Sequence, residues 1–190
     1  MTVVNVMIHG GYATLITDTL ASSPLRADFH VSKVREIPHM RLAVATRGNI
    51  GAVDKVATAL CQYATNYQTA RTFLDSMFAG LELGNADVFV VGYDEDKPAG
   101  FIVSSVNTGG KVVDIPYILC TPTVSDAAFD AFTDDPAANM LEFVAQQCRK
   151  DKRCGGWVNV TQVGPQVIET YTAGLIMDGH IITPAAGEAA

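Results

Sequence analysis

The pattern of hydrophobic and polar positions changes its period along the chain. It opens with two short apolar runs, 2–9 and 12–17, which are joined by Gly10 and Gly11. Glycine adopts positive φ without steric cost, and the tight turns of β-hairpins require such angles. Two strand-forming runs around a Gly-Gly pair therefore predict a β-hairpin at the start of the chain.

Helical spacing replaces the strand pattern after Gly48. Apolar residues recur three and four positions apart over 50–67 and again over 69–83, which predicts two amphipathic helices. Gly84 and Asn85 follow the second run and are typical of a helix end. The segments between the hairpin and these helices are predicted as a polar loop, a partly alternating run and a short buried strand: 20–28, 29–37 and 41–46.

Strand-like runs return in the second half of the chain. Three of them are separated by turn residues, and Pro116 places part of the last at an edge or bulge. Asp135 and Pro136 have the residue types of an N-cap and a first helical position, which predicts a third helix. Segment 125–132 is predicted as a helix or a long loop. The predicted strands are 87–93, 100–106, 112–119, 157–163 and 165–172.

This order of elements predicts an α+β fold. Strands, a helix pair, strands, a helix and strands follow one another, which favours antiparallel sheets covered by helices. The arrangement that fits is a four-layer α-β-β-α sandwich of two antiparallel sheets. The 190 residues contain no internal repeat and no linker, so we predict a single domain over 1–183 and a flexible tail over 184–190.

Composition narrows the class of function. The chain is 48% hydrophobic and 17% charged, which is typical of a compact globular protein. A net charge of −7 argues against binding of nucleic acid phosphates. No apolar run is long enough for a membrane span, and the N-terminal residues lack the pattern of a signal peptide. The four cysteines and four histidines show no metal-ligand spacing, so we expect reduced thiols, a cytoplasmic location and no metal.

Thr2 is the first residue with candidate chemistry. Met1 precedes a small residue, a setting in which methionine removal is common, and its loss would give Thr2 a hydroxyl and a free α-amine. An α-amine has a pKa of about 7.7–8.0, so one residue would supply both a nucleophile and a base. The alternative is that Thr2 is only the first residue of an edge strand.

Three blocks of the sequence resemble the proteasome β-subunit and its bacterial two-ring relative. Thr2 and its hairpin lead to Thr17-Asp18, and a Lys-Val-Arg-Glu-Ile segment at 33–37 precedes a buried strand and a glycine. Segment 151–159, Asp-Lys-Arg-Cys-Gly-Gly-Trp-Val-Asn, is similar to an Asp-x-x-Ser-Gly-Gly-x-x-Asn motif of that family. The blocks keep the order of the family from residue 2 to about residue 163.

The resemblance implies a catalytic group around Thr2. Asp18 and Lys33 would form a buried ion pair that lowers the pKa of the Thr2 hydroxyl, and Asp151 would hold the N-terminal amine. Cys154 takes the place of the serine in the motif. Without the resemblance, Asp18 fits a turn residue, Lys33 a solvated strand face, and Asp151 an ordinary charge at a helix end.

The substrate cleft that the resemblance implies departs from the family pattern. Arg47, followed by Gly48, stands where the family has a glycine whose N–H serves the oxyanion, and this predicts a crowded cleft with a preference for acidic side chains. A Gly-Ser-Gly loop is replaced by residues 119–122, where Thr121 can stand in for the serine hydroxyl. The nucleophile and its ion pair are therefore retained, whereas the oxyanion and supporting groups are altered.

The resemblance implies a threonine peptidase that acts on peptides without a cofactor. Such subunits self-associate into rings or a larger assembly, commonly with an ATPase unfoldase as partner. The alternative is a non-catalytic structural or binding subunit that keeps the fold and retains Met1. A third possibility is an amidase of the wider N-terminal-nucleophile group, since fold alone does not define the substrate.

Overall fold

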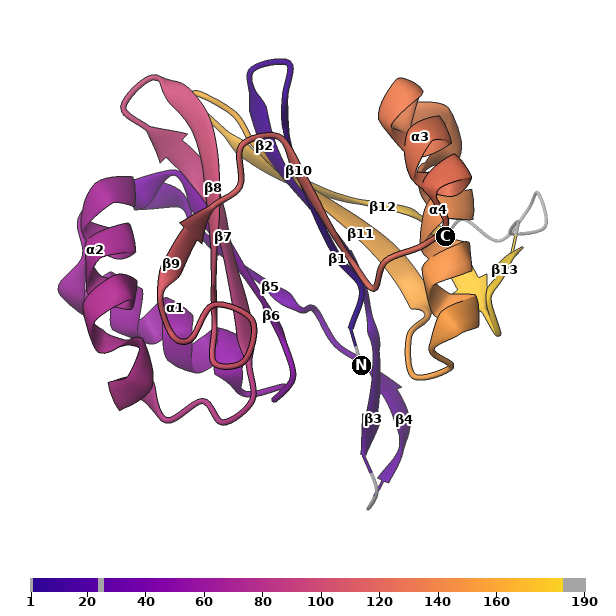
Figure 1. The fold of residues 1–190 in the computed structure, drawn as a ribbon, viewed down its shortest axis with the longest axis horizontal. Coiled ribbons are helices and arrows are strands. Elements are labelled where there is room, and N and C mark those ends of the chain that lie inside the picture. The colour runs from indigo at the N-terminus through magenta and orange to yellow at the C-terminus, as the bar shows by residue number, and fades with distance from the viewer. Residues whose placement is uncertain (1, 24–25, 183–190) are drawn as a thin grey trace, which may run out of the picture.

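Two antiparallel sheets stack face to face, and a pair of helices covers the outer side of each (Figure 1). The structure is a computed structural model that describes residues 2–23 and 26–182. The six-stranded sheet has the order β10 (Ile118–Thr121), β1 (Val4–His9), β2 (Tyr12–Asp18), β11 (Gly156–Val163), β12 (Ile168–Met177) and β13 (His180–Ile182). The five-stranded sheet has the order β5 (Val34–Ile37), β6 (Leu42–Arg47), β7 (Asp87–Asp94), β8 (Lys97–Ser104) and β9 (Val112–Asp114). This architecture confirms the predicted four-layer α-β-β-α sandwich.

Three apolar clusters hold the four layers together. The central one lies between the sheets and joins residues of β1 and β2, such as Val4 and Leu15, to Ala45 and Phe89 of the facing sheet. A second cluster lies between the five-stranded sheet and its helices, and a third lies under the other helix pair. Because both faces of each sheet are buried, the central strands are apolar on both sides.

The predicted N-terminal hairpin is confirmed. β1 and β2 pair from Val4↔Thr17 to His9↔Tyr12. Gly10 and Gly11 form the turn with φ of +61° and +80°, angles that L-residues with side chains rarely adopt. The hairpin places Asp18 at the end of β2, beside the beginning of β1.

Helices form where apolar spacing predicts them, with shifted boundaries. α1 (Ala52–Tyr63) and α2 (Tyr67–Met77) cover the five-stranded sheet. Asn66 caps α2 in a reciprocal capping box with Thr69, so the break falls before Tyr67 rather than after it. The remainder of the predicted second helix is a 3-10 turn, Phe78–Leu81.

The other helix pair covers the six-stranded sheet. α3 (Asp126–Asp134) and α4 (Pro136–Lys150) contribute Phe132, Phe143 and Val144 to the third cluster. Asp135 caps α4 by accepting a hydrogen bond from the Ala138 N–H at 3.0 Å, which confirms the predicted helix start. None of the described helices is both long enough and apolar enough to cross a membrane.

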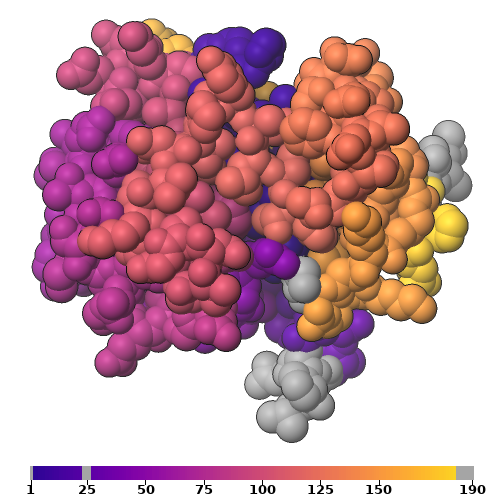
Figure 2. Space-filling view, viewed as in Figure 1, coloured from indigo at the N-terminus to yellow at the C-terminus, as the bar shows by residue number. Residues whose placement is uncertain are grey.

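Two segments differ from their predictions. The polar segment 20–28 is a two-stranded ribbon, β3 (Leu20–Ser23) with β4 (Arg26–His30), because its strands pair with each other and the Gly155 carbonyl accepts from the Leu20 N–H. The predicted strand 112–119 is two strands, β9 and β10, one in each sheet. The 105–125 region therefore crosses the front of the molecule between its two halves (Figure 2). The predicted tail, 184–190, lies outside the described residues.

Candidate active site

The Asp18 carboxylate is the centre of the candidate site. It ends β2 and is fully buried. Its Oδ1 atom accepts hydrogen bonds from the Val3 N–H at 2.8 Å and from the Lys33 ammonium at 2.7 Å. Its Oδ2 atom accepts from the Gly155 N–H at 2.9 Å. Three segments that are distant in sequence are thus tied to one carboxylate.

Lys33 reaches Asp18 from the segment that leads into the five-stranded sheet. It lies just before β5, in the connection that runs from the β3–β4 ribbon past the beginning of β1 (Figure 1). Its side chain is 6% exposed, and its ammonium also donates to the Leu20 carbonyl at 2.6 Å. An ammonium has three N–H donors, so two of them are used by Asp18 and Leu20.

Thr2 lies beside this ion pair because the next residue, Val3, is hydrogen-bonded to Asp18. Val3 and Lys33 bind the same Oδ1 atom, which fixes the backbone next to Thr2 close to the ammonium. Thr2 is 8% exposed. Among the described residues, none makes a hydrogen bond with the Thr2 hydroxyl, and the predicted effect of the Lys33 charge on its pKa stays a prediction.

Opposing effects act on the ionisation of Asp18. Burial raises the pKa of its carboxyl group, since a charge is costly to remove from water. The charge of Lys33 and the hydrogen bonds from Lys33, Gly155 and Val3 each lower that pKa. Removing any of these donors would therefore favour the protonated form of Asp18.

Arg47 and Thr121, both predicted for the substrate cleft, contact each other. The Arg47 guanidinium donates to the Thr121 hydroxyl at 2.9 Å and lies 3.5 Å from the Asp87 carboxylate. Thr121 pairs with Val4 in the sheet, so this contact lies two residues along the chain from Thr2. Because Asp87 neutralises part of its charge, we expect Arg47 to favour acidic substrates only weakly.

Gly48, the third residue predicted for the cleft, has a structural reason to be glycine. Its φ is +113°, and a Cβ at this position would collide with the carbonyl oxygen of Asn85. The chain therefore passes against the turn before β7 at this point, which needs a residue without a side chain.

Asp151 is engaged differently from its predicted role. Its carboxylate accepts hydrogen bonds from the backbone N–H and the guanidinium of Arg153, at 2.8–3.0 Å. These side-chain hydrogen bonds are the main cause that lowers the pKa of Asp151 to about 2. Its predicted partner is the Thr2 nitrogen, which becomes the N-terminal amine only when Met1 is removed, so that role stays a prediction.

Cys154 contributes through the backbone around it. Its N–H donates to the Asp151 carbonyl at 3.0 Å, and the next residue, Gly155, binds Asp18. The side chain is buried, and burial is the main cause that raises the pKa of its thiol to about 12. The neutral thiol is a poor nucleophile, which leaves Thr2 as the nucleophilic candidate.

The cysteines differ in exposure, and this difference predicts the order in which an alkylating reagent modifies them. We expect iodoacetamide near neutral pH to modify Cys61, which is exposed. Cys148 and Cys154 should react only after unfolding, because burial raises both thiol pKa values to about 12. Mass spectrometry of proteolytic peptides measures the order, and modification of Cys154 in the folded protein as fast as Cys61 would contradict it.

Several groups at the site were not among the predicted site residues. The Gly155 N–H and the Leu20 carbonyl complete the surroundings of the ion pair, and Asp87 pairs with Arg47. The Gly-Gly motif could have indicated Gly155, whereas a backbone carbonyl has no signature in a sequence. Within the described residues, His, Cys, Asp and Glu form no group of three or more that could hold a metal.

The four-layer sandwich is a proteasome-like fold, which this chain shares with known structures. Two solved structures with this fold are a Gly-1 mutant of Anbu from Hyphomicrobium sp. strain MC1 and Anbu, described as an ancestral beta-subunit, from Yersinia bercovieri. Their TM-scores are 0.70 and 0.69, at 13% and 12% sequence identity. Each alignment covers 90% of this chain. It covers 86% of the Hyphomicrobium chain and 87% of the Yersinia chain.

The family inferred from the sequence is wrong. The chain matches no family model, and no curated protein is significantly similar to it. The two similar solved structures named above are Anbu proteins, and no sequence comparison supports a proteasome β-subunit. The prediction rested on short blocks around Thr2, Lys33 and Cys154. At 12–13% identity, the likeness to the Anbu structures shows the fold alone.

Proposed function

We propose that this protein is an N-terminal threonine hydrolase, with Thr2 as its nucleophile after removal of Met1. The observation that carries the proposal is the Asp18 Oδ1 atom, which binds the Val3 N–H and the Lys33 ammonium together. A buried ion pair is costly unless it is well satisfied. The Asp18–Lys33 pair lies beside Thr2, and a catalytic role for Thr2 explains this position because its hydroxyl would then need a positive charge nearby.

The chemistry needs only groups of this chain and water. After Met1 is removed, the Thr2 oxygen attacks the carbonyl carbon of an amide, and the α-amine accepts the hydroxyl proton. The third N–H of Lys33 stabilises the developing negative charge on that oxygen. The proton passes to the leaving amine as the C–N bond breaks, which leaves an ester on Thr2. Water then hydrolyses this ester and restores the hydroxyl.

Peptides are the proposed substrate class, with self-association of the chain into rings or a larger assembly. The fold shared with Anbu, one example of which is described as an ancestral beta-subunit, supports the assembly. Enclosure of the site would restrict substrates to unfolded chains, and an ATPase unfoldase is the kind of partner that supplies them. Size-exclusion chromatography with light scattering tests the assembly, and a monomer at micromolar concentration would contradict it.

A second candidate function is a non-catalytic subunit that retains Met1. Arg47 favours this alternative, because its guanidinium is bound to Thr121 and Asp87 where the cleft would have to admit substrate. The two candidates differ in the N-terminus that the working protein carries. They also differ in whether Thr2 matters for more than the start of β1.

The test compares two forms of the protein that differ only at the N-terminus. One is released from a cleavable fusion so that Thr2 is its first residue, and the other keeps Met1. We expect the first form alone to hydrolyse short fluorogenic peptides, since only it has the free amine. Turnover of small amides but not peptides would favour an amidase. Equal activity of both forms, or none with either substrate class, would overturn the proposal.

A further inference from the structure

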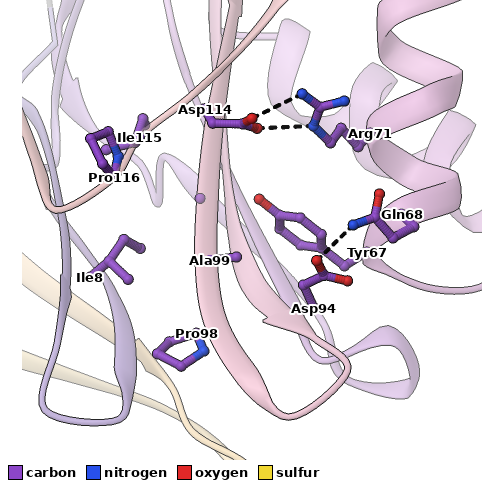
Figure 3. A pocket seen from close by; sticks show the side chains of 11 residues that line it. Ile8, Tyr67, Gln68, Arg71, Asp94, Pro98, Ala99, Asp114, Ile115 and Pro116 are labelled. Atoms are coloured by element: carbon purple, nitrogen blue, oxygen red, sulfur yellow. Dashed lines mark hydrogen bonds and ion pairs between the residues drawn. The ribbon is translucent and has the colours of Figure 1, made fainter.

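A pocket lies at the opposite end of β1 from Thr2. Its volume is about 440 Å³, and it is bounded by α2, by the β7–β8 turn and by β9 (Figure 3). Ile8, near the hairpin turn, forms part of its wall. Strands rise by about 3.3 Å per residue, so this pocket is on the order of 20 Å from the candidate active site. The two sites therefore have no residue in common.

The polar side of the pocket has two carboxylates, Asp114 and Asp94, and each is hydrogen-bonded to a side chain of α2. Arg71 binds Asp114 through two hydrogen bonds, at 2.9 and 3.0 Å. Gln68 donates to Oδ2 of Asp94 at 2.6 Å. One guanidinium thus faces two carboxylates, and the pocket has a formal charge of −1. Because Arg71 is already held by Asp114, an anion would have to displace a carboxylate to bind there.

Tyr67 gives the pocket an unpaired hydroxyl. The residue is 4% exposed, and its ring packs edge-on against Phe101. Figure 3 shows the Tyr67 ring between the Arg71–Asp114 and Asp94–Gln68 pairs, with its hydroxyl on the side away from Gln68. No described residue forms a hydrogen bond with this hydroxyl. Since no fully buried side-chain oxygen or nitrogen among the described residues lacks a hydrogen-bond partner, this hydroxyl must be accessible from the pocket, where a donor group of a ligand can reach it.

Electrostatics keep this hydroxyl protonated. Burial is the largest cause that raises the pKa of Tyr67, and the charges of Asp114 and Asp94 raise it further. A neutral phenol oxygen has lone pairs that accept hydrogen bonds. The opposite wall is apolar and includes Ile8, Pro98 and Pro116, which suits a short aliphatic chain.

We propose that this pocket binds a primary ammonium group on an aliphatic chain. The ammonium would donate to the Tyr67 hydroxyl and to the Asp94 carboxylate, and its methylene groups would lie on the apolar wall. A metal ion fits less well, since within the described residues no three potential ligands gather here. A free alkylamine and a lysine side chain of a peptide share this chemistry.

Calorimetric titration of the full chain tests the proposal. The probes are n-butylamine hydrochloride and an acetylated, amidated Ala-Lys-Ala peptide, with 1-butanol and sodium butyrate as neutral and anionic controls. We expect the ammonium probes to bind and the controls not to bind. Binding of the peptide alone would identify a lysine side chain as the source. Equal binding of butanol or butyrate, or binding by neither ammonium probe, would overturn the proposal.

Matched variants locate the binding. Tyr67→Phe keeps the ring against Phe101 and removes only the hydroxyl, and Asp94→Asn keeps the shape of the side chain. Each should weaken ammonium binding at least about fivefold, because hydrogen bonds to charged groups are the stronger ones. Tyr63→Phe and Asp54→Asn are the controls, since both side chains are exposed on α1. Unchanged binding by Tyr67→Phe with an unchanged melting temperature would exclude the hydroxyl as a ligand.

Discussion

Thr2→Ala is expected to abolish hydrolysis while leaving the fold intact. The substitution removes the proposed nucleophilic oxygen, and loss of a nucleophile lowers kcat/KM by on the order of 10⁴-fold or more. No described residue bonds to the Thr2 hydroxyl, so the free energy of unfolding should change by less than about 1 kcal/mol. Peptide hydrolysis and urea denaturation measure the two effects.

Alanine and serine are informative replacements at this position. Alanine is also small, so removal of Met1 should proceed in Thr2→Ala as in the parent protein, and intact mass verifies this. Thr2→Ser keeps a hydroxyl on the first residue and should retain measurable activity. Activity of Thr2→Ala within tenfold of the parent would show that another group performs the chemistry.

Lys33→Met is expected to cause the largest loss of stability. It leaves the Asp18 carboxylate buried without its cation, and removing one partner of a buried ion pair costs about 3–5 kcal/mol. Asp18→Asn should have a similar cost, because it leaves the Lys33 ammonium buried. The double variant should lose less than the sum of the two single losses, since no uncompensated charge remains. Urea denaturation of the four proteins gives this coupling.

The ion pair between Arg35, two residues after Lys33, and Asp54 of α1 provides the control because it is much more exposed to solvent. Arg35 and Asp54 lie 2.6 Å apart, with side chains 35% and 61% exposed. Exposed ion pairs contribute about 0–1 kcal/mol, so Asp54→Asn should barely change stability. If Lys33→Met proved as mild as Asp54→Asn, the ion pair would not be the buried, satisfied pair on which the proposed activation of Thr2 depends.

Local signals in the sequence were sufficient for much of the fold. Gly10 and Gly11 specify the first hairpin, and Asp135 with Pro136 specifies the start of α4. The ribbon over 20–28 was missed because its strands are stabilised by contacts across the chain, such as the one between Leu20 and Gly155. Non-local pairing of this kind leaves no periodic pattern in a short polar segment.

The site was predictable in its charged residues and not in their surroundings. Asp18 and Lys33 were named together because a family-like spacing linked them, and the structure brings them into contact. The bond between Arg47 and Thr121 joins residues 74 positions apart, which no local pattern reveals. The family was misassigned because short blocks around a shared fold are less specific than similarity over the whole chain.

The most direct measurement is the intact mass of the protein from its native host, before and after treatment with a β-lactone that acylates N-terminal threonine. We predict a mass that lacks Met1, followed by the addition of one probe, which peptide mapping places on Thr2. Lys33→Met should lose this labelling under conditions in which it remains folded. Native protein that keeps Met1, or a probe attached elsewhere, would contradict the assignment of Thr2 as the nucleophile.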